Sequence, residues 1–205
     1  MDLYKYENEL YERGIEYIGG VDEVGRGPLI GPVVTACVVL PKNFTLDGLT
    51  DSKKLSEKKR DLFYDYIINN CIAYEVAEVS PERIDEINIY EASKEAMILA
   101  INKVKNKINL QHVLVDAMPL DISIPTTSII KGDSKSITIA AASVIAKVTR
   151  DRMMYELDKK YPQYEFGKHK GYPTKKHIEA INKYGLIEGY RKTYGPVKDI
   201  LNKEK

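Results

Sequence analysis

Four carboxylates occupy positions from which they could act on one ligand. Asp22 and Glu23 end one apolar stretch, Asp116 ends a second, and Asp133 directly precedes a long helical pattern. In an open α/β sheet the ends of neighbouring strands and the N-termini of helices converge at one edge, where ligands bind. Carboxylates brought together there would raise one another's pKa unless a cation neutralised them. The four positions therefore predict an acidic site.

The ligand types of this acidic site indicate which metal it would bind. Carboxylate oxygens without histidine or thiolate favour a hard ion, Mg²⁺ or Mn²⁺, over zinc. Two such ions about 3.5–4 Å apart suit in-line displacement at phosphorus. Taken singly, each acid also fits a helix cap or a surface charge, and Asp133 fits a helix entry favoured by the macrodipole. Because side chains alternate along a strand, Glu23 would join Asp22 only if the following loop turned its carboxylate round.

A glycine loop, "GRGPLIG", follows the first two acids. It matches neither the Walker pattern nor a G-x-G-x-x-G sequence that enters a helix. Gly25, Arg26 and Gly27 could bring bare backbone and a guanidinium against a sugar-phosphate. Side-chain-free backbone is suited to reading a 2′-hydroxyl, which distinguishes RNA from DNA. The alternative is an ordinary turn between two strands.

Basic residues surround an aromatic ring in "KHKGYPTKKH", residues 168–177. Lys168 and Lys170 flank Tyr172 on one side, an arrangement that suits a nucleic-acid backbone with a sugar or base stacked on the ring. Lys53, in "DSKKLS", is a second candidate phosphate contact. The alternatives are an exposed loop with solubilising lysines and a plain helix entry.

Composition restricts the class of protein. The 205 residues carry a net charge of +1, but residues 161–205 hold ten Lys/Arg against five Asp/Glu, so one end is basic. The start of the chain has no signal-peptide pattern, and its apolar runs are too short to cross a membrane. Cys37 and Cys71 do not form a Cys-x-x-Cys pair, and the three histidines lack a metal-binding spacing. We therefore expect a cytoplasmic protein with buried thiols.

The periodicity predicts an α/β fold with a mixed sheet, because a strand–loop–strand hairpin comes first and later strands follow helices. Asp2 is the expected N-cap of the first helix, and Ser134 and Ser136 are expected to cap the last long one. We divide the chain into a catalytic domain, 1–160, and a C-terminal helical substrate-binding subdomain, 161–205. Strands are predicted over residues 16–23, 31–41, 73–79, 111–116 and 126–130, and helices over 3–13, 56–70, from 81, 90–108 and 134–161.

Taken together, these segments resemble ribonuclease HII, the type 2 ribonuclease H family. The resemblance covers residues 17–197 and implies a ribonuclease H-like mixed sheet flanked by helices. By the same resemblance, the four acids bind metal, the Gly-Arg-Gly loop reads the ribose, and Tyr172 senses the RNA–DNA junction. The motifs that carry it, in chain order, are "GVDEVGRGPLIGPVV", "DSKKLS", "VLVDA", "KGDSKS", "AAASVIAKVTRD", "HKGYPT" and "YGPVK".

The resemblance also implies an activity. The enzyme would cut the RNA strand of RNA–DNA hybrids and single ribonucleotides embedded in duplex DNA, on the 5′ side of the ribonucleotide. Two Mn²⁺ or Mg²⁺ ions would support hydrolysis to a 3′-hydroxyl and a 5′-phosphate, in DNA replication and repair. We expect a monomer, and the terminal "DILNKEK" shows no docking motif for a replication clamp.

Two alternatives stay open at the level of sequence. A junction resolvase on the same fold would not need a 2′-hydroxyl reader, so all-DNA substrates or Arg26→Ala would distinguish it. A non-catalytic nucleic-acid-binding module would tolerate Asp116→Asn, whereas the enzyme would lose turnover and still bind its substrate.

Overall fold

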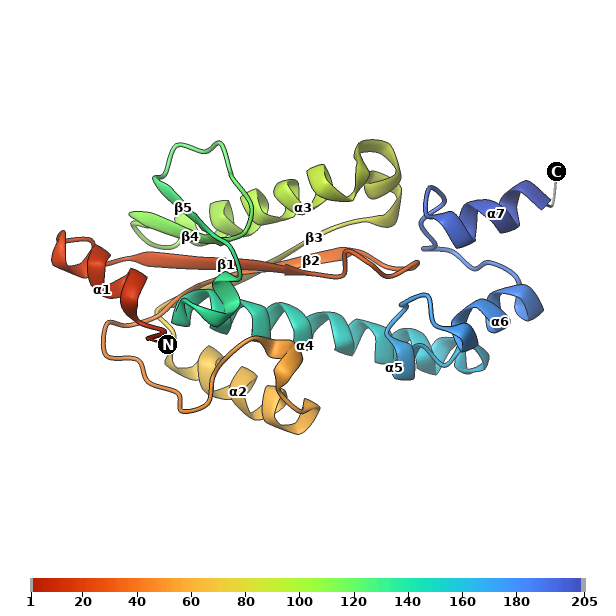
Figure 1. The fold of residues 1–205 in the computed structure, drawn as a ribbon, viewed down its shortest axis with the longest axis horizontal. Helices are drawn as coiled ribbons and strands as arrows, with labels where there is room; N and C mark the ends of the chain where they lie inside the picture. Colours follow the sequence, from red (N-terminus) through yellow and green to blue (C-terminus); the bar gives the residue numbers. More distant parts are fainter. Residues whose placement is uncertain (1, 204–205) are drawn as a thin grey trace.

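The computed structural model describes residues 2–203 and contains a five-stranded mixed sheet. Its strand order is β3-β2-β1-β4-β5, with β1 antiparallel to β2 and parallel to β4 (Figure 1). The predicted α/β class and the opening hairpin are therefore confirmed. The strands are β1 (Ile18–Val24), β2 (Val33–Val39), β3 (Ala73–Val79), β4 (His112–Asp116) and β5 (Thr126–Ile129).

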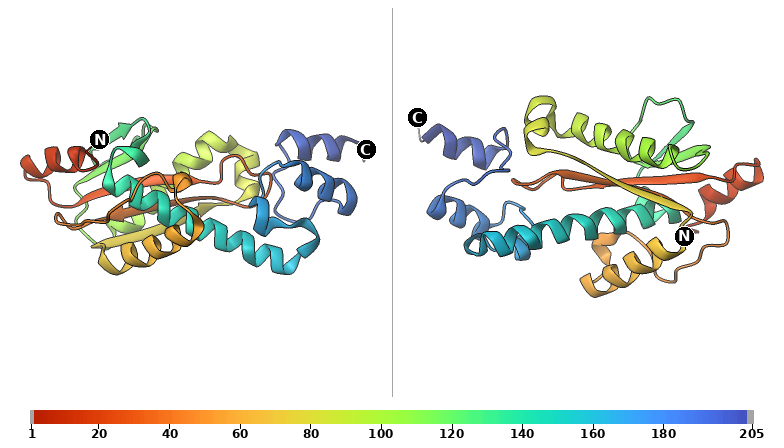
Figure 2. Two further views of the ribbon diagram at one scale, coloured as in Figure 1. Left: turned by 60° about the horizontal axis from the view of Figure 1, so that its bottom comes forward. Right: turned by 180° about the vertical axis from the view of Figure 1, so that it is seen from behind.

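Helices cover both faces of this sheet, as Figures 1 and 2 show. Helix α3 packs on one face and α4, backed by α2, on the other, so every residue of β2 is buried. An apolar strand without alternation is typical of such a covered sheet. The helices are α1 (Lys5–Glu12), α2 (Glu57–Asn70), α3 (Pro81–Lys105), α4 (Ile137–Lys160), α5 (Phe166–His169), α6 (Lys175–Tyr184) and α7 (Gly195–Lys203), with 3-10 turns η1 (Ser52–Lys54), η2 (Gly132–Ser134) and η3 (Pro162–Tyr164).

The contact between α4 and the central strand is backbone to backbone. A Cβ added at Gly20 in β1 would lie 2.2 Å from the carbonyl carbon of Thr138 in α4. Only glycine allows this approach, because real Cβ atoms do not come within 3.0 Å of other atoms. Close packing here fixes the start of α4 beside the strand that carries the first two acids.

The start of the first helix differs from the prediction, whereas the division of the region after residue 80 agrees with it. The N-cap of α1 is Tyr4, and Asp2 accepts a hydrogen bond from the Tyr4 amide at 2.8 Å from outside the helix. The two helical stretches predicted after residue 80 are confirmed, because α3 consists of two helical segments separated by a kink at Asn88, where φ is 69° and ψ is 165°. Asn88 Oδ1 accepts from the amides of Tyr90 and Glu91 at 2.9 and 3.1 Å and so caps the start of the second segment.

The last quarter of the chain gathers around its own apolar cluster beyond one end of the sheet (Figure 1). Tyr164, Phe166 and Ile181 are buried there together with Leu29 and Ile30 from the loop between β1 and β2. The glycine loop is thereby built into the C-terminal packing, and the domain division at residue 160 stays a prediction. Among the described residues, no helix combines the length and apolar character that a membrane span requires.

Candidate active site

Three of the four predicted acids meet at the end of two neighbouring strands. Strands β1 and β4 run parallel with Val21 opposite Val115, so the next residues, Asp22 and Asp116, lie side by side. One carboxylate oxygen each from Asp22, Glu23 and Asp116 lies within 4.8 Å of the others. Glu23 lies inside β1 rather than in the loop, and its amide donates to Asp22 Oδ1 at 2.7 Å. The Asp22 carboxylate is therefore turned toward the Glu23 backbone.

Asp133 lies at the border of this acidic trio. It is in η2, and the preceding Gly132 amide donates to Asp116 Oδ1 at 2.6 Å. Burial and then the charges of Asp51 and Asp116 raise the pKa of Asp133. The short turn therefore both orients the Asp116 carboxylate and adds a fourth acid next to it. Ser136, not Ser134, caps the following helix α4.

The electrostatics of the trio are unfavourable without a counter-charge. Burial, followed by the charges of Glu23 and Asp116, raises the pKa of Asp22 well above its usual range. Burial also raises the pKa of Glu23, although an ion pair with Arg26 at 3.5 Å opposes the rise. Glu23 Oε2 is buried and has no hydrogen-bond partner within residues 2–203. This oxygen-only donor set with a free acceptor fits a hard divalent cation.

A cavity of about 280 Å³ opens beside these acids and includes other predicted residues. Lys53, held by η1, and Tyr172 both line it. Tyr172 also packs on the glycine loop, because a Cβ added at Gly27 would lie 3.2 Å from its ring. The acids, the Gly-Arg-Gly loop and the tyrosine are thus brought to one place. The full lining is Asp22, Glu23, Val24, Ser52, Lys53, Arg60, Ser143, Lys147 and Tyr172.

The other two predicted lysines do not line this cavity. Lys168 is exposed and pairs with Glu165 one helical turn away. The Lys170 ammonium lies 3.6 Å from the ring centroid of Tyr155 and donates to the Gly167 carbonyl. Local partners therefore hold both ammonium groups, and their contact with phosphate stays a prediction.

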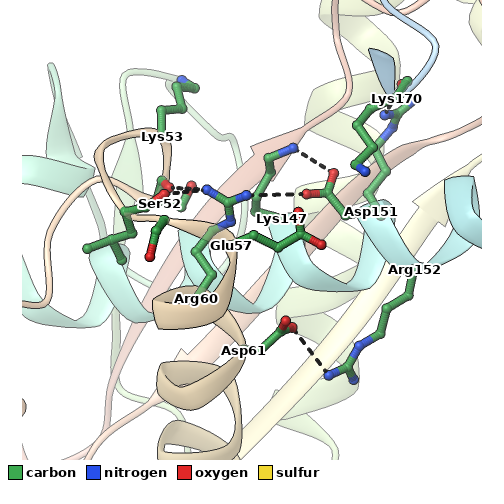
Figure 3. Close-up of polar contacts among 12 residues, drawn as sticks. Ser52, Lys53, Glu57, Arg60, Asp61, Lys147, Asp151, Arg152 and Lys170 are labelled. Atoms are coloured by element: carbon green, nitrogen blue, oxygen red, sulfur yellow. Dashed lines mark hydrogen bonds and ion pairs between the residues drawn. The ribbon is translucent and has the colours of Figure 1, made fainter. Parts of the chain in front are cut away.

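Several polar residues of the cavity wall were not singled out from the sequence (Figure 3). Arg60 of α2 donates to the carbonyls of Ser52 and Leu55 at 3.1 and 2.6 Å and pairs with Asp151 at 3.7 Å. Asp151 also accepts from Lys147 at 2.6 Å, one helical turn away in α4. The sequence does not predict this role for Arg60, because its partners are backbone carbonyls and Asp151, which lies far away in sequence on α4.

Comparisons with known proteins agree with this geometry. The family model described as ribonuclease HII matches residues 19–194. Ribonuclease HII of Bacillus cytotoxicus is 59% identical over 201 residues, which cover 98% of this chain and 77% of that protein. Ribonuclease HII of Bacillus mycoides is 58% identical over 203 residues, which cover 99% of this chain and 78% of that protein.

A solved structure shares the fold. Ribonuclease H2 from Pyrococcus horikoshii OT3 has a TM-score of 0.76 and 31% identity, covering 91% of this chain and 98% of that chain. The complex of PCNA with ribonuclease HII from Archaeoglobus fulgidus gives a TM-score of 0.70 and 27% identity, and the match covers 87% of this chain and 95% of that chain. These relatives favour a ribonuclease H over a junction resolvase or a non-catalytic binding module. The chain therefore belongs to the ribonuclease HII family and is a nuclease with ribonuclease H activity on RNA–DNA hybrids.

Proposed function

We propose that the enzyme cleaves on the 5′ side of a ribonucleotide, including a single ribonucleotide in duplex DNA, and leaves a 3′-hydroxyl and a 5′-phosphate. One observation carries this proposal: Asp22, Glu23 and Tyr172 line the same cavity, Asp116 lies beside the first two, and the Tyr172 ring lies against Gly27 of the Gly-Arg-Gly loop. A ribose placed against Gly27 would have its neighbouring phosphodiester near the carboxylates. The selectivity for ribose and the cleavage chemistry would then act on adjacent atoms.

The carboxylates of Asp22, Glu23 and Asp116 would hold the catalytic cation, with Asp133 completing its surroundings. The buried, unpartnered Glu23 Oε2 and the raised pKa of Asp22 support this assignment. Their hard oxygen ligands suit Mg²⁺ or Mn²⁺. When bound, two such ions would stabilise the negative charge on the attacking oxygen and on the leaving oxygen during hydrolysis of the phosphodiester.

The protein's own residues would bind and orient the substrate. The backbone of Gly25, Arg26 and Gly27 would hydrogen-bond the 2′-hydroxyl, which DNA lacks. Tyr172, whose side chain lies against Gly27, would stack on the sugar of the following deoxynucleotide. Lys53 lines the cavity, and no ion pair within residues 2–203 includes its ammonium. It would therefore be available to contact a phosphate of the substrate.

The setting of this reaction is also part of the proposal. We infer a role in removing ribonucleotides during DNA replication and repair, by an enzyme acting as a monomer. Cys37 and Cys71 are free thiols, which supports a reducing, cytoplasmic compartment. The Archaeoglobus fulgidus relative is known in complex with PCNA, which supports testing a replication clamp as a partner of this chain.

Asp116→Asn tests the assignment of the acids. Because the variant keeps the shape but removes one charge, we expect it to bind an RNA–DNA hybrid within about threefold of wild type and to lose at least about a hundredfold in cleavage rate. Mn²⁺ should raise the melting temperature of wild type and not that of Asp116→Asn. Asp121→Asn is the control, since it changes an exposed acid outside the cavity. Unchanged cleavage in Asp116→Asn would refute the assignment.

A further inference from the structure

Two arginine side chains are completely buried behind the glycine loop. Arg150 in α4 and Arg191 in the segment between α6 and α7 are both 0% exposed. None of the ion pairs formed within residues 2–203 includes either guanidinium. A buried charge is costly unless its donors are satisfied, and burial lowers the pKa of Arg150 to about 10. Both residues therefore need partners strong enough to offset that cost.

The partners of Arg191 are the backbone carbonyls of the predicted ribose-reading loop. Its Nη2 donates to the Gly25 carbonyl at 2.6 Å and to Gly31 at 2.8 Å, and its Nη1 donates to the Arg26 carbonyl at 3.0 Å. The Tyr194 hydroxyl donates to the same Arg26 carbonyl at 2.6 Å and accepts from Arg191 Nη1 at 2.9 Å. A planar guanidinium with five fixed donors is suited to hold several carbonyls at once.

Arg150 links the same loop to the Tyr172 segment. It donates to the carbonyls of Ile30 and Pro32 at 3.0 and 3.2 Å, and to that of Lys170 at 2.9 Å. A backbone bond from the Leu29 amide to the Gly171 carbonyl, 2.8 Å long, joins the two segments directly. The spacing between the loop and the tyrosine is therefore set by the buried Arg150 together with this backbone bond.

The bonds to Arg191 also determine which way the loop amides face. Peptide bonds of the described chain are all trans, and in a trans peptide the N–H points away from the carbonyl. Holding the carbonyls of Gly25 and Arg26 inward therefore directs the amides of Arg26 and Gly27 outward. No hydrogen bond within residues 2–203 uses either of these two amides. They are consequently oriented to donate to a ligand.

We propose that Arg191 is a positioning residue for ribose discrimination, which presents the amides of Arg26 and Gly27 to the 2′-hydroxyl of the substrate. This inference rests on the proposed function, which assigns ribose reading to the loop. Arg191 itself is fully buried and does not touch the substrate. Its contribution is the fixed orientation of two peptide planes, so its loss affects the preference for ribose more than the general affinity for a duplex.

The test compares binding of two duplexes in an Asp116→Asn background, where the substrate is not consumed. One duplex is all DNA, and the other carries one ribonucleotide at a single position. Arg191→Lys keeps the charge but cannot reach three carbonyls at once, so the ratio of the two Kd values should fall on the order of tenfold. The Kd for all-DNA duplex should stay within about twofold, because the exposed lysines are unchanged.

A milder variant and a matched control exclude a folding effect. Tyr194→Phe removes only the hydroxyl bonds to Arg26 and Arg191 and should lower the ratio about threefold. Tyr164→Phe removes hydroxyl bonds to Tyr184 and Gly185 in the same region and should leave the ratio unchanged. Equal weakening of both duplexes, or an unchanged ratio in Arg191→Lys and Tyr194→Phe, would overturn the inference. A parent without any preference for the ribonucleotide would instead refute ribose reading itself.

Discussion

Replacing Gly20 by alanine should destabilise the fold more than any ordinary glycine substitution. The added Cβ would lie 2.2 Å from the Thr138 carbonyl carbon and 2.5 Å from the Ile139 amide nitrogen. Ordinary contact begins at 3.4 Å, so α4 would have to move about 1.2 Å away from β1. The obstructing atoms are helix backbone, and no side-chain rotation can relieve the contact.

The magnitude follows from two opposing effects. Alanine restricts the unfolded chain and by itself stabilises a compatible site by about 0.4–1 kcal/mol. Overpacking against a rigid backbone costs about 1–3 kcal/mol or more, and the displaced helix also loses contacts along the sheet. We expect a net loss of about 2–3 kcal/mol in the free energy of unfolding. In a protein of this size that loss corresponds to a fall of roughly 5–10 °C in melting temperature.

Urea unfolding followed by circular dichroism measures this loss, with Gly195→Ala as the matched control. Gly195 begins α7, and a Cβ added there meets nothing within 4 Å. The control should therefore be neutral or slightly more stable than wild type. If Gly20→Ala and Gly195→Ala differ by less than about 0.5 kcal/mol, the close packing of α4 on β1 is not what holds this sheet.

Three further predictions concern buried polar groups. Glu7→Ala should lower the free energy of unfolding in urea by about 2 kcal/mol, because the buried Glu7 Oε1 accepts from the Thr138 amide and hydroxyl at the start of α4. A loss no larger than that of Glu9→Ala, which changes an exposed acid, would contradict this. Burial lowers the pKa of His177 to about 4, so as the pH falls the unfolded state binds a proton before the folded state does. The free energy of unfolding should therefore fall by up to about 3 kcal/mol between about pH 6.5 and pH 4. His177→Gln should flatten this slope, and an equal slope in the variant would contradict the lowered pKa of His177. Asp151→Ala leaves the partly buried Lys147 and Arg60 without a counter-charge and should lower the free energy of unfolding by about 2 kcal/mol, measured by thermal unfolding. Asp61→Ala, which breaks an exposed ion pair with Arg152, should lower it by less than about 0.5 kcal/mol. Equal losses in the two variants would contradict this.

The meeting of the acids follows from short-range patterns. Asp22 lies near the end of β1 and Asp116 ends β4, and parallel neighbours bring such positions together, so their proximity could be expected from the sequence. Asp133 comes close because the turn before α4 returns to the same edge. The contact of Gly20 with α4 is not predictable in this way, because nothing near Gly20 in sequence states which helix crosses it.

Contacts to backbone carbonyls also escape sequence reasoning. Arg150 and Arg191 bind carbonyls 120 and 166 residues away, and a carbonyl acceptor is the same for every residue type. The local partners of basic loop residues are equally hard to predict from sequence. Lys168 and Lys170 suggest phosphate contacts by composition, but a nearby carboxylate and an aromatic ring engage their ammonium groups in the fold. Composition gives the charge of a loop, whereas tertiary structure determines which charges are available.

The most direct measurement is cleavage of a DNA duplex that carries one ribonucleotide, beside the same duplex made entirely of DNA, with Mg²⁺ or Mn²⁺ present. We predict a single cut on the 5′ side of the ribonucleotide, with a 3′-hydroxyl on one product and a 5′-phosphate on the other, and no cut in the all-DNA duplex. Cleavage of long RNA–DNA hybrid without any cut at the single ribonucleotide would contradict junction sensing by Tyr172. Equal cleavage of both duplexes would contradict ribose reading by the Gly25–Gly27 loop.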